Sequence, residues 1–173
     1  MSNLPETIRP LELVRRLARV EGDMEIAGMK RLAGRLADSG GTVHADLRFG
    51  RDAGNVRYVR GRIRTRLTLT CQRCLEDLCF PVDIAVSLGI IGAAGEAESL
   101  PGEYEPLLLD ESETMRLGDL IEDELILALP IVARHGREEC SAALPEAPHE
   151  AHEAGRAETH RPFADLAELM KTR

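Results

Sequence analysis

The chain has 173 residues and a mass of 19.0 kDa, which suits one domain or a domain with tails and requires no disulfide for folding. A net charge of -8 argues against a general nucleic-acid binder, and an aromatic content of 3% leaves little material for stacking single-stranded bases. The charge is uneven, because residues 1–74 hold 15 Lys and Arg against 8 Asp and Glu, whereas the remainder carries a balance of -15.

The first ten residues, MSNLPETIRP, contain no apolar stretch that would act as a signal peptide. Farther along, the apolar runs at 78–91 and 125–133 are either interrupted by Pro and Asp or too short to cross a bilayer. We therefore expect a cytoplasmic protein that does not span a membrane.

Hydrophobic periodicity predicts the elements in the basic part of the chain. Apolar residues at helical spacing predict helices over 9–20 and 28–37, and Gly40-Gly41 then breaks the chain. Period-two alternation with one polar face is typical of a half-exposed antiparallel sheet, and it predicts strands over 42–49, 55–71 and 78–90. Residues 50–54, RDAGN, suit a hairpin loop.

The acidic part begins with an irregular segment over 92–116, followed by an amphipathic helix over 117–129 that ends at Pro130. Asp119 and Glu122 have the spacing of a capping pair. Consecutive acids at 122–124 fan out around a helix, so we expect a solvated face and no catalytic residues.

These patterns predict an α+β fold in a single domain, with an antiparallel sheet packed against helices within 1–140. Residues 141–162 are rich in Ala, Glu, His and Pro and indicate a flexible linker. A short C-terminal helix is expected within 163–173.

Two pairs of residues have metal-ligand spacing. Cys71 and Cys74 form a C-x2-C pair at the end of a predicted strand, and His135 and Cys140 follow the helix that Pro130 ends. Together they make a Cys3His set, which is coordinatively closed and therefore typical of structural zinc. A redox pair, or buried cysteines with a surface histidine, are the alternatives. Cys79 lies in an apolar strand, where we expect it to be buried.

Arginines recur along the second predicted strand. Side chains two residues apart on a strand share one face and are spaced about 6.6–6.8 Å apart, close to the phosphate spacing of a nucleic-acid backbone. Guanidinium groups bind phosphate bidentately, so one hypothesis is an RNA-contacting stripe. The alternative is a solvated face paired with acidic side chains. The candidate RNA-binding residues are Arg57, Arg60, Arg62, Arg64, Arg66 and Arg73.

Four segments together resemble the YceD family, the large ribosomal RNA subunit accumulation proteins. They are TCQRCLE (70–76), YEPLLLD (104–110), LIEDELILALPIVARHGREEC (120–140) and RPFADLAELMK (161–171). Similar bacterial chains carry cysteine in place of His135, which is a conservative exchange for zinc.

The resemblance implies a non-enzymatic factor in ribosome biogenesis that promotes synthesis, processing or accumulation of large-subunit ribosomal RNA. Its partners would be that RNA or pre-ribosomal proteins, with no DNA expected. The alternative is an acidic module that binds basic ribosomal proteins or a nuclease without touching RNA.

Overall fold

Alternating apolar and polar residues build a five-stranded sheet with one buried face, in a computed structural model that describes residues 3–110, 114–136 and 139–140. The order of strands is β2-β3-β4-β5-β6, and β2 to β5 run antiparallel. The fold is therefore of the α+β class. The strands are β2 (Arg19–Glu25), β3 (Thr42–Arg51), β4 (Arg57–Thr70), β5 (Asp77–Ile91) and β6 (Glu105–Leu108).

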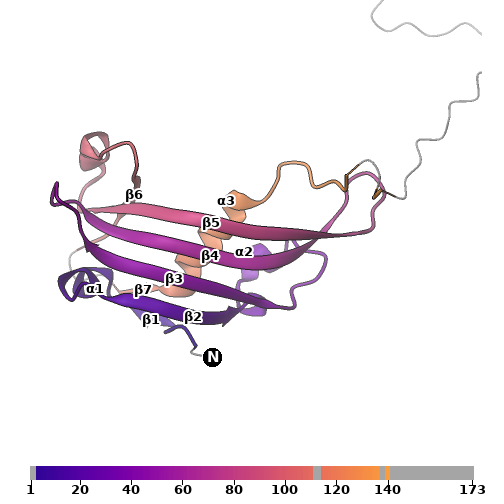
Figure 1. The fold of residues 1–173 in the computed structure, drawn as a ribbon, viewed down its shortest axis with the longest axis horizontal. Helices are drawn as coiled ribbons and strands as arrows, with labels where there is room; N and C mark the ends of the chain where they lie inside the picture. Colours follow the sequence, from indigo (N-terminus) through magenta and orange to yellow (C-terminus); the bar gives the residue numbers. More distant parts are fainter. Residues whose placement is uncertain (1–2, 111–113, 137–138, 141–173) are drawn as a thin grey trace, which may run out of the picture. The chain divides into compact units, whose positions relative to one another are not determined.

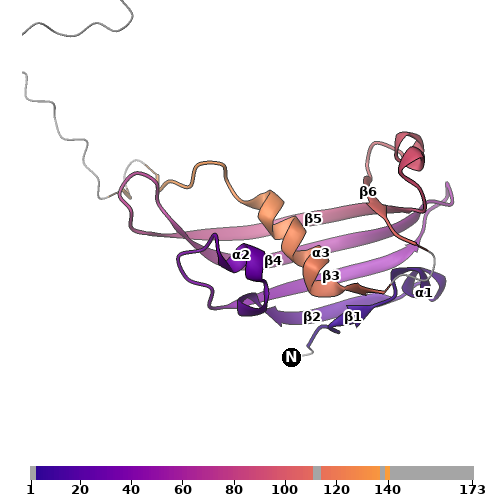
Figure 2. The same ribbon diagram turned by 180° about the vertical axis from the view of Figure 1, so that it is seen from behind.

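Helices α1, α2 and α3 pack on one face of this sheet, as expected, and no α-helix of the described residues covers the other face (Figures 1 and 2). Helix α3 (Leu117–Ala128) crosses the strands diagonally and buries Leu117, Ile121 and Leu125 against them. The remaining elements of this layer are β1 (Thr7–Ile8), α1 (Pro10–Arg15), the 3-10 turn η1 (Ile26–Gly28), α2 (Lys30–Ala33) and β7 (Met115–Arg116), with β1 paired to β7.

Two expected helices are much shorter than their periodicity predicts. The helix expected over 9–20 ends at Arg15, and strand β2 begins four residues later. The helix expected over 28–37 is reduced to α2, a single turn. Strand β2 forms because it pairs with β3 along its full length, so a long-range ladder overrides the local helical pattern.

The irregular segment expected over 92–116 contains regular structure. It holds the 3-10 turn η2 (Ala94–Ser99), strand β6 and strand β7. Strand β6 runs parallel to β5, so the sheet is mixed, whereas the strands predicted over 42–90 pair antiparallel as expected. The predicted linker 141–162 and C-terminal helix lie outside the described residues.

Two predictions about single side chains are also wrong. Cys79 is exposed, because the alternation in β5 turns Leu78 and Phe80 toward the core and Cys79 toward the open face. Glu122 is 6% exposed and does not cap its own helix. Its Oε1 accepts the N–H groups of Arg31 at 2.7 Å and Leu32 at 3.0 Å, and thereby caps the start of α2.

Strand β5 has a partly open edge. Strand β6 pairs only with Leu88–Ile91, so within the described residues no strand covers the stretch of β5 from 77 to 87 on that side. Pro81 lies in the middle of this stretch. Among the residues that the structure describes, no helix is long and apolar enough to cross a membrane.

Candidate functional site

The loop between β4 and β5 brings the first two cysteines together. Strand β4 ends at Thr70, and the following turn is closed by an N–H bond from Leu75 to the carbonyl oxygen of Cys71 at 2.8 Å. Leu75 has a φ of 65°, which turns the chain back toward β5. Cys71 is buried and Cys74 is half-buried, so the two thiols lie on the inner side of this turn.

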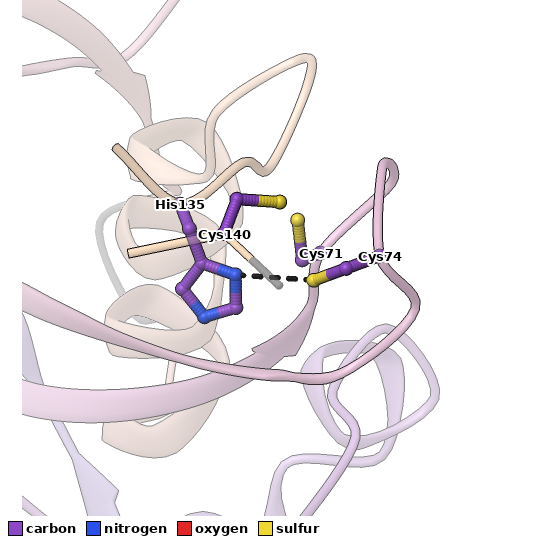
Figure 3. Close-up of side chains that lie close together, drawn as sticks. All are labelled: Cys71, Cys74, His135 and Cys140. Carbon is purple, nitrogen blue, oxygen red and sulfur yellow. Dashed lines mark hydrogen bonds between the residues drawn. The ribbon is translucent and has the colours of Figure 1, made fainter. Parts of the chain in front are cut away.

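The segment after α3 supplies the other two donors (Figure 3). The N–H of Gln72 donates to the carbonyl oxygen of Ala133 at 2.8 Å, which holds this segment against the turn. The ligand atoms of the predicted set lie within 4.8 Å of one another, and these residues are Cys71, Cys74, His135 and Cys140. The fold therefore brings together residues that lie more than sixty positions apart in the sequence.

The four donors lie close enough together to hold one metal ion. Zn–S and Zn–N bonds of about 2.3 and 2.0 Å require donors about 3.5–3.8 Å apart. The Sγ of Cys74 lies 3.4 Å from Nδ1 of His135. The Nε2 of His135 lies 3.0 Å from the carbonyl oxygen of Asp77, which fixes the proton on Nε2 and leaves the Nδ1 lone pair facing the thiols.

Electrostatics at this cluster favour ionised sulfur. Hydrogen bonds from backbone N–H groups, chiefly that of Cys74, outweigh burial and lower the pKa of Cys71 to about 5. Burial acts to lower the pKa of His135, but its bonds to Cys71 and to the carbonyl of Asp77 raise it. A thiolate at Cys71 beside an oriented imidazole, with two further cysteines nearby, can bind a soft divalent cation.

The open face of the sheet carries the arginines of β4. Arg62, Arg64 and Arg66 are exposed and alternate with the buried residues Ile63 and Leu67, so they share the face that no helix covers in the described part of the chain (Figure 1). The structure thus places these three predicted residues together.

Acidic neighbours neutralise this stripe only in part. Asp83 lies across from Arg64 on β5 and is 3.4 Å from both Arg62 and Arg64, so two cations share one carboxylate. No ion pair involves Arg66 within the described residues. Toward β2 the face becomes acidic, with Glu21 and Asp23 near His44.

One basic residue of this face was missed. Arg48 on β3 lies opposite Arg60 and is exposed. In the strand predicted over 42–49, Arg48 stands at one of the polar positions that alternate with the apolar residues. The alternation alone could therefore have identified it.

The other three predicted arginines do not belong to this exposed group. One points to the buried side of the strand, and the other two contact other protein groups. Arg57 has the phase of the buried side chains and lines a cavity beside Leu100. Arg73 contacts the cysteine cluster through a bond from Nε to Sγ of Cys140 at 2.9 Å. Arg60 belongs to a polar and aromatic cluster at the far end of β4.

That far cluster is centred on Tyr104, which is buried and stands in the chain just before β6. Its hydroxyl donates to Oδ2 of Asp52 at 2.7 Å, and its ring lies 6.5 Å from that of Tyr58. The guanidinium carbon of Arg60 is 4.4 Å from the centre of the Tyr104 ring, and its Nη2 is 2.7 Å from Glu103. Burial and the Asp52 contact raise the pKa of Tyr104 to about 12.

Comparisons with known proteins agree with the resemblance noted from the sequence. The family profile described as "Large ribosomal RNA subunit accumulation protein YceD" matches residues 59–170. A protein of that name from Haemophilus influenzae is 29% identical over 168 residues, which cover 97% of this chain and 97% of the relative. No solved structure gives a significant match.

Proposed function

Because the chain belongs to the YceD family of large ribosomal RNA subunit accumulation proteins, we propose that it promotes the accumulation of large-subunit ribosomal RNA by binding it. The proposed role is one of binding, without catalysis. The name of the Haemophilus influenzae relative supports the biological process, and the arginines of β4 support the mode of contact.

The observation that carries the RNA contact is the exposure of Arg62, Arg64 and Arg66 on a sheet face that, among residues 3–110, 114–136 and 139–140, no helix covers. Three guanidinium groups at a strand spacing of about 6.6–6.8 Å can each engage a backbone phosphate. Because Asp83 is shared by two of them, part of their charge remains available to an anion. We therefore expect contacts to phosphates rather than to stacked bases.

Binding of purified protein to large-subunit ribosomal RNA fragments, measured against salt concentration, tests this contact. The double variant Arg62→Glu/Arg64→Glu should lose affinity at least tenfold and show a shallower salt dependence, because each lost phosphate contact reduces the slope. The matched control is Arg15→Glu/Arg116→Glu, which makes the same charge change at exposed positions on α1 and β7. Equal affinities of the two double variants would remove the β4 arginines from the proposal.

A cellular experiment tests the process and separates RNA from protein partners. Cells that lack the protein should accumulate less large-subunit ribosomal RNA, measured by gradient sedimentation. Ribosomal partners that are lost from an affinity capture after RNase treatment support direct RNA contact. Partners that persist after RNase treatment would instead identify a protein-binding module with no RNA contact.

The cysteine cluster supports a second element of the proposal, a structural zinc ion bound by Cys71, Cys74, His135 and Cys140. All four donors come from protein, so the ion would have no open position for a substrate, and it would stabilise the end of the sheet. Elemental analysis of protein purified under reducing conditions should find about one zinc per chain. Metal-free protein that retains its full thermal stability would overturn this assignment.

A further inference from the structure

We propose that Arg73 is a positioning residue of the Cys3His centre, where it neutralises the Cys140 thiolate and holds the segment after α3 against the β4–β5 loop. The inference rests on the proposed zinc ion. The fork of Arg73 reaches that segment at several points, with Nε 2.9 Å from Sγ of Cys140 and Nη2 3.2 Å from the carbonyl oxygen of Gly136. A third contact, 3.5 Å long, joins Nη2 to the carbonyl oxygen of His135.

The position of Arg73 in the chain explains why it can perform this task. It stands between the two ligands of the loop, so its backbone is fixed whenever Cys71 and Cys74 are held in place. Its own backbone N–H also donates a hydrogen bond to Cys71. One residue therefore touches a sulfur from each half of the cluster, through its backbone on one side and its side chain on the other.

Charge balance gives a second reason. A zinc ion bound to three thiolates and a neutral imidazole carries a formal charge of about -1, which is costly to keep in a partly buried site. A guanidinium beside one of the sulfurs offsets that charge, and its hydrogen bond reduces the charge density on Cys140. Outer partners of this kind typically change metal affinity by about 10–100-fold.

These contacts also separate Arg73 from the arginines of β4. Arg73 is half-buried and two of its nitrogens are engaged, whereas Arg66 is exposed and has no ion pair among the described residues. A lysine would keep the charge of Arg73 but would not reproduce the hydrogen bonds of its planar guanidinium group. The contribution of the charge and that of the hydrogen bonds can therefore be tested separately.

The experiment compares Arg73→Gln, Arg73→Lys and the control Arg66→Gln as zinc-loaded proteins. Zinc affinity is measured by competition with a chromophoric chelator, and the folding of each variant is checked by circular dichroism. We expect Arg73→Gln to bind zinc about 10–100-fold more weakly than the control, with Arg73→Lys in between. If Arg73→Gln does not fold, Arg73→Lys alone must still bind more weakly than the control.

Two further readouts distinguish positioning from general stabilisation. Cobalt-substituted protein should show a shifted sulfur-to-metal charge-transfer band in Arg73→Gln, and Cys140 should become the fastest thiol to be alkylated in the zinc-loaded variant. Unchanged zinc affinity, cobalt spectrum and alkylation order would overturn the role of Arg73 while leaving the zinc site intact. A wild-type chain that binds neither metal would overturn both the zinc proposal and this inference.

Discussion

The two ends of the β4–β5 hairpin fasten distant parts of the chain by different chemistry. At the end near β6, Tyr104 is buried, donates to Asp52 and stacks near Arg60. At the other end, three cysteines and His135 converge on one point. Both clusters join a loop to a segment that is far away in the sequence.

The two clusters differ in the source of their stability. The Tyr104 cluster pairs the Tyr104 hydroxyl with Asp52 and the Nη2 of Arg60 with Glu103, and it leaves the buried Nε of Arg60 without a hydrogen-bond partner among the described residues. Its stability therefore depends on packing and on contacts between protein groups. The cysteine cluster brings together groups that repel one another once ionised, so a bound cation would supply most of its stability. One end should therefore respond to metal availability and the other should not.

Metal removal should produce the largest difference between the ends. We expect a chelator to lower the Tm by about 10 °C or more, because zinc binding energy adds directly to folding energy. Cys74→Ser should melt at the lower temperature with or without chelator. The matched control is Cys79→Ser, an exposed cysteine outside the cluster, which should behave as wild type. A Tm that is insensitive to chelator in all three proteins would contradict the comparison.

A smaller loss is expected when the other end is weakened. Tyr104→Phe removes the hydroxyl that donates to Asp52 and should lower the Tm by a few degrees, measured by differential scanning fluorimetry. Its response to chelator should equal that of wild type. Tyr58→Phe makes the same chemical change on the neighbouring ring, whose hydroxyl has no hydrogen bond to the described residues, and should have little effect. Equal losses in both variants would show that the Asp52 contact is unimportant.

Two arginines of β4 should also differ in how much they stabilise the protein, because Arg60 belongs to the Tyr104 cluster and Arg64 does not. Arg60→Lys loses the fork that lies between Glu103 and the tyrosine rings and should lower the Tm by about 1–3 °C. Arg64→Lys, at an exposed position, should leave the Tm within error while weakening RNA binding. The idea fails if Arg64→Lys destabilises the protein as much as Arg60→Lys does.

The effect of pH at the Tyr104 end should be the smallest of these differences. Hydrogen bonds from Tyr104 and from the N–H of Val56 hold the pKa of Asp52 below its ordinary value of about 3.9. A lowered pKa in the folded state stabilises the protein above about pH 4 and loses this effect as the pH falls. The difference in Tm between wild type and Tyr104→Phe should therefore shrink below pH 4. A constant difference from pH 7 to pH 3 would argue against this source of stability.

Sequence patterns predicted the parts of the fold that depend on local periodicity. Period two is read directly from residues 42–90, so β3, β4 and β5, and the exposure of Arg62 and Arg64, followed from the chain alone. Strand β2 was missed because RVEGDME has only Val20 and Met24 as large apolar residues, and its strand state comes from pairing with β3.

The candidate sites could be predicted only where the spacing of residues along the sequence indicates that they lie close together in the fold. The C-x2-C spacing made Cys71 and Cys74 a pair, whereas the approach of His135 and Cys140 depends on where α3 ends above the sheet. Arg73 was grouped with the β4 arginines because it follows them closely in sequence. Only the turn after Thr70 directs it toward Cys140. Glu122 looked solvated because its partners, Arg31 and Leu32, lie ninety residues away along the chain.

The incomplete cover of β5 has a consequence for the behaviour of the protein at high concentration. An edge of unpaired backbone can recruit a strand from another molecule and seed aggregation. Pro81 provides no N–H group to such a strand, and Asp83, two residues on, adds a charge that a second copy of the same edge would repel. Replacing both with valine would create a continuous β-prone stretch, so we expect Pro81 and Asp83 to limit edge-to-edge association wherever this edge stays uncovered.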